Sequence, residues 1–130
     1  MFRPVNFTIF ATDAERCIAF YSTLFGWRFA KRDQSSNQWN ILTGEADTPG
    51  INGFLWLRNG IFVDKPELRG FVNAFICTIH VPDVDAISKR IADLGGFAFQ
   101  KVHAPGIGWL VSVKDPEGNF LSLLQRELRN

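Results

Sequence analysis

An internal repeat at an offset of seventy residues constrains the fold of this chain more than any other feature. The repeated positions include a helix start, a helix end and strand residues, which a duplicated folding unit would retain. The identical pairs, aligned without a gap, are Thr8 and Thr78, Ile9 and Ile79, Asp13 and Asp83, Leu24 and Leu94, Gly26 and Gly96, Phe29 and Phe99, Lys31 and Lys101, and Trp39 and Trp109. We therefore predict two copies of one folding unit in tandem.

The first half begins with a strand and a helix. Residues 5–11 alternate in the manner of a strand and are rich in Phe, Ile and Thr. Thr12 is the expected N-cap of the helix, and Glu15, three positions later, completes a capping box. The helix carries one apolar stripe, made of Cys17, Phe20, Tyr21 and Leu24. Gly26 is expected to end it in the left-handed conformation.

The second half repeats this pattern. Asp83 is the expected N-cap, and Gly95 and Gly96 are expected to end the helix. Its apolar stripe consists of Val84, Ile87, Ile91 and Leu94. Three strands are expected after each helix, over residues 26–31, 38–43 and 51–58, then 96–102, 108–114 and 119–126. Between the last two, Asp115 to Gly118 has the residue choices of a type I turn.

These elements predict an α+β fold, in which a single domain contains two βαβββ units. The first unit is expected over residues 1–60 and the second over residues 73–130. Residues 61–72 include Pro66 and Gly70 among charged residues, and we interpret them as a linker. A chain of 130 residues, 46% of them hydrophobic, can bury a core of this size.

Charge and hydropathy exclude two classes of partner. The formal net charge is +1 and the basic residues are scattered among acids, so no nucleic-acid surface is expected. No stretch approaches the ~20 apolar residues that span a bilayer, so no membrane partner is expected.

Cys17 and Cys77 lie in apolar surroundings far apart in the chain, so we expect two buried thiols in a reducing compartment, the cytoplasm. A disulfide is the alternative.

Two parts of the sequence are similar to a known family. They are FTIFATDAERCIAFYSTLFGWRF, at residues 7–29, and LGGFAF followed by GIGWLVSVKDPEGNFLSLLQ, at residues 94–99 and 106–125. Here the chain resembles the vicinal oxygen chelate superfamily, which includes glyoxalase I, bleomycin-resistance proteins and extradiol dioxygenases. The resemblance covers nearly the whole chain. It implies that the curved mixed sheets of the two units enclose a cup, with one helix per unit outside, and that function resides in the cup.

Strand alternation predicts which side chains face this cup, because residues two apart share a face. The helix-facing side is expected to carry Phe7, Ile9, Cys77, Ile79, Leu121 and Leu123. The cup side is expected to carry the ligand-binding residues, namely Asn6, Thr8, Phe10, Asn52, Phe54, Trp56, Ile76, Thr78, His80, Phe120, Ser122 and Leu124.

Poor ligands occupy the metal-binding places of the superfamily. The resemblance implies His or Glu on the first and last strands of each unit, and these places correspond to Asn6, Ile76, Ser122 and Asn52 or a neighbour. A divalent cation needs about three or four N, O or S donors, preferably anionic. Because Ile76 has no donor and the others are neutral, we expect no metal ion and no other cofactor.

Two main classes of function follow. The first is a metal-free protein similar to the bleomycin-resistance branch, whose apolar cup binds a small aromatic or apolar molecule. The second is an enzyme, a lyase, isomerase or dioxygenase, with a displaced metal site or with His80 as general base. The alternative interpretation of His80 is a surface residue, and the other histidine, His103, falls in a loop. We favour the binding protein because the ligand places are not His or Glu.

A third class is an interaction module whose aromatic groove takes a peptide or a subunit. The resemblance also implies a homodimer. The identity of the ligand, the occurrence of any reaction, and the pairing of units within or between chains stay open.

Overall fold

The computed structural model describes residue 3 and residues 5–34, 37–58 and 76–127. The chain divides into two compact units, Met1–Asn73 and Ala74–Asn130. The predicted linker, residues 61–72, lies outside the described residues. In the part of the chain that the structure describes, no helix is long and apolar enough to cross a bilayer.

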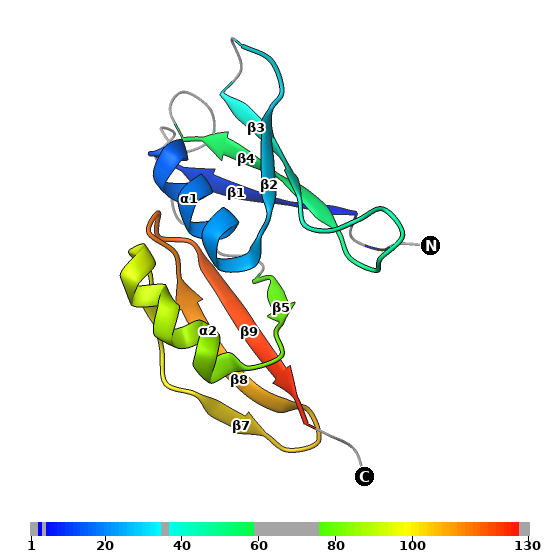
Figure 1. The fold of residues 1–130 in the computed structure, drawn as a ribbon, viewed down its shortest axis with the longest axis vertical. Helices are drawn as coiled ribbons and strands as arrows, with labels where there is room; N and C mark the ends of the chain where they lie inside the picture. The colour runs from blue at the N-terminus through cyan, green and yellow to red at the C-terminus, as the bar shows by residue number, and fades with distance from the viewer. Residues whose placement is uncertain (1–2, 4, 35–36, 59–75, 128–130) are drawn as a thin grey trace, which may run out of the picture. The chain divides into compact units, whose positions relative to one another are not determined.

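The first unit has one helix and a four-stranded mixed sheet (Figure 1). Along the chain its elements are β1 (Asn6–Ala11), α1 (Ala14–Phe25), β2 (Arg28–Lys31), β3 (Gln38–Leu42) and β4 (Asn52–Leu57). The strand order in the sheet is β1-β4-β3-β2, with β1 parallel to β4 and the other neighbours antiparallel. The predicted βαβββ order of this unit is therefore present.

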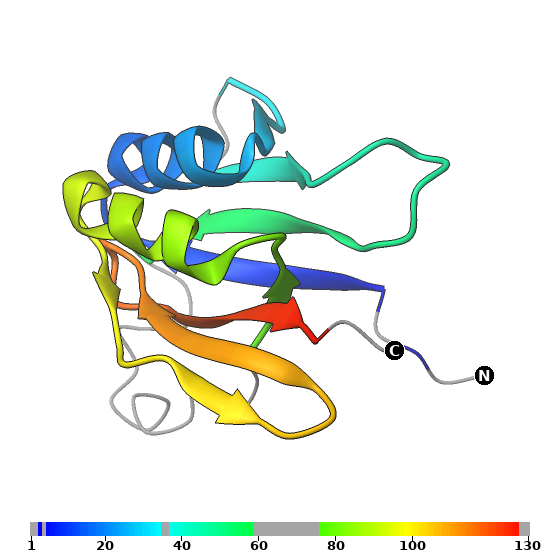
Figure 2. The same cartoon turned by 60° about the horizontal axis from the view of Figure 1, so that its bottom comes forward.

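The second unit has the same order with one additional strand. Its elements are β5 (Thr78–His80), α2 (Val84–Ile91), the 3-10 helix η2 (Ala92–Leu94), β6 (Phe97–Ala98), β7 (Val102–Ala104), β8 (Gly108–Lys114) and β9 (Phe120–Arg126). The sheet order is β5-β9-β8-β6, and β7 also pairs with β8. Figure 2 shows α2 lying across one face of its own sheet, where it contacts β6, β8 and β9. The predicted α+β class is confirmed.

Helix α1 is capped by Asp13 and not by Thr12. The backbone of Asp13 is extended, and its carboxylate accepts a hydrogen bond from the Arg16 N–H at 3.1 Å. The predicted Thr12 cap and its capping box with Glu15 are therefore wrong. Either residue can cap a helix, but the Asp13 carboxylate also adds negative charge at the positive end of the helix dipole. The helix ends at Gly26 as predicted, in the left-handed conformation with φ 74°.

The core of each unit is formed by the helix stripe and by alternate strand residues. In α1 the whole predicted stripe is buried. In the second unit, Val84 and Ile91 of α2 are buried, whereas Ile87 of α2 and Leu94 of η2 are half-buried. The buried hydrophobic side chains of the strands are Ile9, Ala11, Ile41 and Leu55 in the first unit and Val111, Val113, Leu121 and Leu123 in the second. Apolar burial of this kind is the main favourable contribution to folding.

Two predictions in the second unit are wrong. The single strand expected over residues 96–102 is two short strands, β6 and β7, on either side of an irregular Phe99–Lys101 segment. Cys77, expected to be buried and helix-facing, is exposed. Since β5 begins only at Thr78, the alternation of that strand does not extend to Cys77. Cys17 is buried as predicted, and both thiols are free.

The hairpin formed by β7 and β8 is fastened to the end of β9 through Glu127. The Glu127 carboxylate accepts a hydrogen bond from the Gly106 N–H at 3.1 Å and pairs with Nε2 of His103. The Glu127 N–H donates to the Ile107 carbonyl at 3.1 Å. The hydrogen bond with His103, followed by that with Gly106, holds the pKa of Glu127 below its ordinary value.

We expect the attachment of the β7–β8 hairpin to the end of β9 to weaken in acid. Because the pKa of Glu127 is lower in the folded state, its contribution to stability is complete above the ordinary carboxyl pKa and is lost as pH falls through the lowered value. Glu127→Gln should abolish this pH dependence. Amide exchange at Gly106 measures the opening of the hairpin. Glu45→Gln, an exposed change in the first unit, is the control, and an unaltered pH profile in Glu127→Gln would contradict the assignment.

Candidate functional site

The six candidate residues of the first unit lie on one face of its sheet. The parallel register of β1 and β4 pairs Asn6 with Asn52, Thr8 with Phe54, and Phe10 with Trp56. The residues between them, including the buried Ile9 and Leu55, face the core beneath α1. We call the face opposite the helix the distal face of the first sheet. The predicted alternation thus brings these six residues onto one surface.

Strand β3 adds two polar residues that the sequence analysis missed. Asn40 pairs with Phe54 and Gln38 pairs with Trp56, so both lie on the distal face. The sequence contained a signal for Asn40, because it alternates with the apolar Ile41 and neighbouring strand residues face opposite ways. In the structure Ile41 is fully buried.

The distal face is aromatic at one end and polar at the other. The rings of Phe10 and Trp56 lie 6.2 Å apart at 88°, the edge-to-face arrangement that aromatic quadrupoles favour. At the polar end, Oδ1 of Asn52 accepts hydrogen bonds from the N–H of Thr43 at 2.9 Å and from its hydroxyl at 3.3 Å. The Asn52 oxygen therefore closes the connection between β3 and β4 and is not a spare metal ligand.

Formal charge on the distal face is confined to its edge. Among the paired strand residues of this face, only Arg28, in edge strand β2, is charged. Its guanidinium is 3.5 Å from the carboxylate of Glu45, and both side chains are exposed. The inner part of the face therefore offers ring surface, amides and one hydroxyl, which suit an uncharged molecule with an aromatic or apolar body.

The second sheet also has a distal face, opposite α2. The parallel register of β5 and β9 pairs Thr78 with Ser122 and His80 with Leu124. Strand β8 contributes Leu110, Ser112 and Lys114, which pair with Leu124, Ser122 and Phe120. Five of the six candidates of this unit therefore lie in paired strands of one face.

Ile76, the sixth candidate, precedes β5 and is 61% exposed. The residue directly beside Ser122 in the ladder is Thr78, while the Ser122 N–H donates to the Cys77 carbonyl at 2.9 Å. Whether Ile76 or Thr78 is taken as the partner of Ser122, the pair supplies neutral hydroxyl oxygens at most.

The side chains at the superfamily's metal-binding places do not fit a divalent ion. Asn6, Asn52 and Ser122 offer only neutral oxygens, the Asn52 oxygen already accepts hydrogen bonds from Thr43, and Ile76 offers no donor atom. In the described ranges, no group of three His, Cys, Asp or Glu side chains is placed to hold a metal ion. A protein site for such an ion needs several anionic or imidazole donors.

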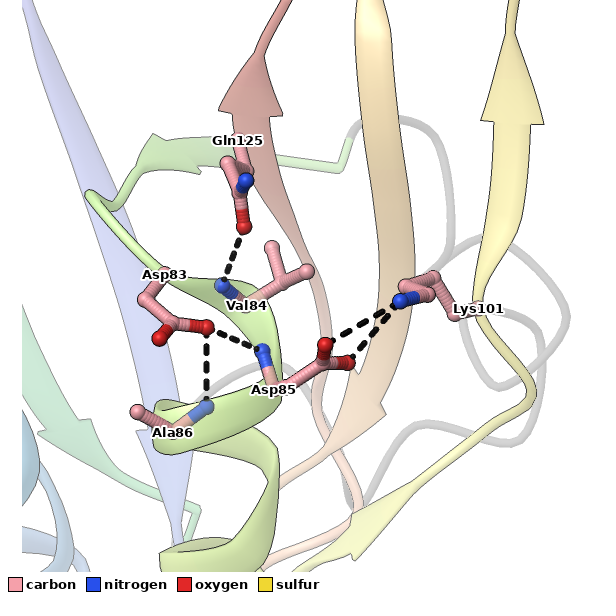
Figure 3. Close-up of polar contacts among 6 residues, drawn as sticks. All are labelled: Asp83, Val84, Asp85, Ala86, Lys101 and Gln125. Carbon is pink, nitrogen blue, oxygen red and sulfur yellow. Dashed lines mark hydrogen bonds and ion pairs between the residues drawn. The ribbon is translucent and has the colours of Figure 1, made fainter.

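The carboxylates at the start of α2 are engaged in the fold (Figure 3). Oδ1 of Asp83 accepts hydrogen bonds from two backbone N–H groups of the first turn, at 3.0 and 3.2 Å. The carboxylate of Asp85 pairs with Lys101 at 3.1 Å. The Val84 N–H donates to Oε1 of Gln125, on β9, at 3.0 Å. These groups accept hydrogen bonds from the first N–H groups of α2 and place negative charge at the positive end of its dipole. Asp83 is therefore the N-cap, as predicted.

Asp115 lies in the turn before β9 and is buried, with 2% of the residue exposed. Its Oδ1 accepts from the N–H groups of Glu117 and Asn119, and its Oδ2 from Nδ2 of Asn119, all at 2.8 Å. The Gly118 N–H donates to the Asp115 carbonyl at 3.1 Å, closing the predicted turn.

The two histidines differ in their surroundings. His80 is exposed at the end of β5, and its side chain makes no hydrogen bond or ion pair to any residue that the structure describes. A general base is ordinarily oriented by a partner, so this geometry gives His80 no particular support. His103 bonds to Glu127, and its ring lies 4.4 Å from that of Trp109, so it has a structural role in the hairpin.

Comparison with known proteins gives one family and a set of similar folds. The model of the glyoxalase-like domain family matches residues 6–124. No curated protein matches the chain. The family match bears out the resemblance that the sequence indicates.

Three solved structures illustrate the similar folds. A glyoxalase-related enzyme from Fulvimarina pelagi has a TM-score of 0.67 and 18% identity, over 95% of this chain and 88% of that one. A glyoxalase/bleomycin resistance protein/dioxygenase family enzyme from Burkholderia phytofirmans has a TM-score of 0.66 and 17% identity, over 91% and 94%. The bleomycin-binding protein of Streptomyces verticillus, solved with copper(II)-bleomycin, has a TM-score of 0.60 and 18% identity, over 98% of each chain. At these identities the likeness concerns the fold.

Proposed function

The chain belongs to the glyoxalase-like domain family, and we propose that it binds a small aromatic or apolar molecule without a metal ion. The observation that carries this proposal is the composition of the distal face of the first sheet. Phe10, Phe54 and Trp56 supply ring surface, while Asn6 and Asn40 supply amides that can orient a polar substituent. Small-molecule sites commonly combine apolar walls with a few polar groups in this way.

The second unit has candidate ligand contacts of its own, on the distal face of its own sheet and, for Ile76, just before β5. They are Ile76, Thr78, His80, Phe120, Ser122 and Leu124. Thr78 and Ser122 offer hydroxyls as hydrogen-bonding groups, and Phe120 and Leu124 offer apolar surface. The protein from Streptomyces verticillus, a structural neighbour, binds bleomycin, so ligand binding is a function that this fold supports.

The proposal predicts that Trp56→Ala weakens the binding of N-phenyl-1-naphthylamine, a neutral aromatic probe that fluoresces when it leaves water. Losing a ring contact of this kind costs about 1–1.5 kcal/mol, or roughly tenfold in Kd. Trp39→Ala is the matched control, because Trp39 lies on the neighbouring strand β3 but on the opposite face, with Lys31 5.5 Å from its ring. Fluorescence titration gives Kd, and circular dichroism checks that both variants are folded.

The site assignment is wrong if Trp39→Ala weakens the probe as much as Trp56→Ala, or if neither does. The enzyme alternative is tested separately with His80→Ala. If His80 acts as a base, this variant should lose turnover in a substrate screen while its Kd for the probe stays within about twofold of wild type.

We also propose that the chain forms a homodimer, which sedimentation equilibrium would detect.

A further inference from the structure

A hollow of about 360 Å³ lies within the second unit, and none of the residues that line it is a ligand contact proposed above. It is lined by Gly95, Gly96, Phe97, Phe99, Lys114, Asp115 and Pro116. One wall is the segment that follows η2, and the other is the turn before β9. These walls approach closely at Gly95, where an added Cβ would lie 3.5 Å from Cβ of Pro116.

Phenylalanines form the apolar side of this hollow. Phe97 is 57% exposed and Phe99 is 44% exposed, and their ring centroids lie 4.9 Å apart at 76°. The ring centroid of Phe99 lies 6.2 Å from that of Phe120, a proposed ligand contact of the second sheet that does not itself line the hollow. Exposed rings grouped in this way leave apolar area in contact with water, and a flat apolar partner would remove it.

Lys114 supplies the charge. The sheet register places it between Phe97 on β6 and Phe120 on β9, in one row across three strands. Its side chain makes no hydrogen bond or ion pair with any residue in the described part of the chain. The neighbouring carboxylate of Asp115 is directed to the turn, where it accepts three hydrogen bonds. The ammonium of Lys114 therefore has no anion of the protein committed to it there.

We propose that this hollow binds a small planar aromatic carboxylate. The ring of such a ligand would lie against Phe97 and Phe99, and its carboxylate would pair with the Lys114 ammonium. The charge of the site selects an anion over a neutral aromatic molecule, whereas the distal face of the first sheet suits an uncharged one. The inference does not rest on the proposed function, because the two sites share no lining residue.

Benzoate and its uncharged analogue benzamide test the proposal. In nuclear magnetic resonance titrations of the ¹⁵N-labelled chain, benzoate should shift the amide signals of Phe97, Phe99 and Lys114, and benzamide should bind about threefold or more weakly. Lys114→Gln should weaken benzoate by the same factor and abolish its preference over benzamide. Lys89→Gln, an exposed change on α2, is the control and should have no effect. Added salt should weaken benzoate selectively.

Equal binding of benzoate and benzamide would overturn the proposal, as would benzoate shifts confined to other residues or unchanged binding in Lys114→Gln. Phe99→Leu tests the aromatic wall independently, because it keeps an apolar side chain and removes the ring. It should also weaken benzoate. Trp56→Ala should leave benzoate binding unchanged, so a failure at the first sheet and a failure at this hollow can be told apart.

Discussion

Gly108→Ala is expected to destabilise the second unit by about 3–5 kcal/mol, the sum of a strained backbone and a steric clash. Gly108 begins β8 with φ 144°, a conformation that residues with a Cβ rarely adopt. A Cβ there would lie 2.0 Å from the Gln125 carbonyl oxygen and 2.8 Å from Cα of Arg126. Because both atoms belong to the backbone of the paired strand β9, they cannot move aside without breaking the ladder that joins β8 to β9.

Gly106→Ala is the matched control for this prediction. Gly106 also has positive φ, at 79°, but an added Cβ would meet no atom within 4 Å. Gly106→Ala should therefore lower stability only through backbone strain, by about 1–2 kcal/mol. Chemical denaturation monitored by circular dichroism gives both values. If Gly108→Ala is no more destabilising than Gly106→Ala, the close pairing at the start of β8 is wrong.

Asp115→Ala is expected to destabilise the protein by about 2–4 kcal/mol, because it leaves three hydrogen-bond donors without their acceptor. Two of them are the N–H groups of Glu117 and Asn119, which share Oδ1, and the third is Nδ2 of Asn119, which uses Oδ2. Asp115→Asn keeps one oxygen and loses the other, so its loss should be intermediate, about 1 kcal/mol. Denaturation midpoints rank the variants.

Asp93→Ala is the control for the loss of a carboxylate, since Asp93 is exposed on η2 and its removal should change stability by less than about 0.5 kcal/mol. An Asp115→Ala variant as stable as Asp93→Ala would show that the buried carboxylate does not hold the turn. It would also leave Asp115 available for another role, which the hydrogen-bond geometry argues against.

Local patterns in the sequence predict most of the fold. The apolar stripe of α1, the left-handed Gly26, the turn at Asp115 and the bounds of β8 all follow from short-range rules, and the structure has them. The N-cap of α1 was off by one residue because Thr12 and Asp13 are both good caps, and where the extended chain turns into the helix decides between them.

The errors in the second unit have a common cause. Cys77 and the expected strand over residues 96–102 were assigned by extending an alternation beyond the ends of real strands. Strand ends depend on pairing with distant segments, and alternation alone does not define them. The pairing of Ser122 with Thr78 is likewise a long-range property that no local pattern reveals.

The candidate site was predictable in part. Alternation assigned Asn6, Thr8 and Phe10 to one face, and the register with β4 brings their partners alongside. The contribution of β3 was missed because its residues were used only to define a strand, although the burial of Ile41 implies that Asn40 faces the other way. The hollow beside Lys114 depends on contacts between β6, the turn and β8, which sequence spacing does not show.

The affinity for N-phenyl-1-naphthylamine, measured in excess EDTA and again with one equivalent of Zn²⁺, Ni²⁺ or Mn²⁺ per chain, tests most directly whether binding is independent of metal. Ile76 has no donor atom, and the neutral oxygens of Asn6, Asn52 and Ser122 should neither retain an ion nor respond to one, so we predict the same Kd under all conditions. Loss of binding in EDTA that a stoichiometric ion restores would contradict the account.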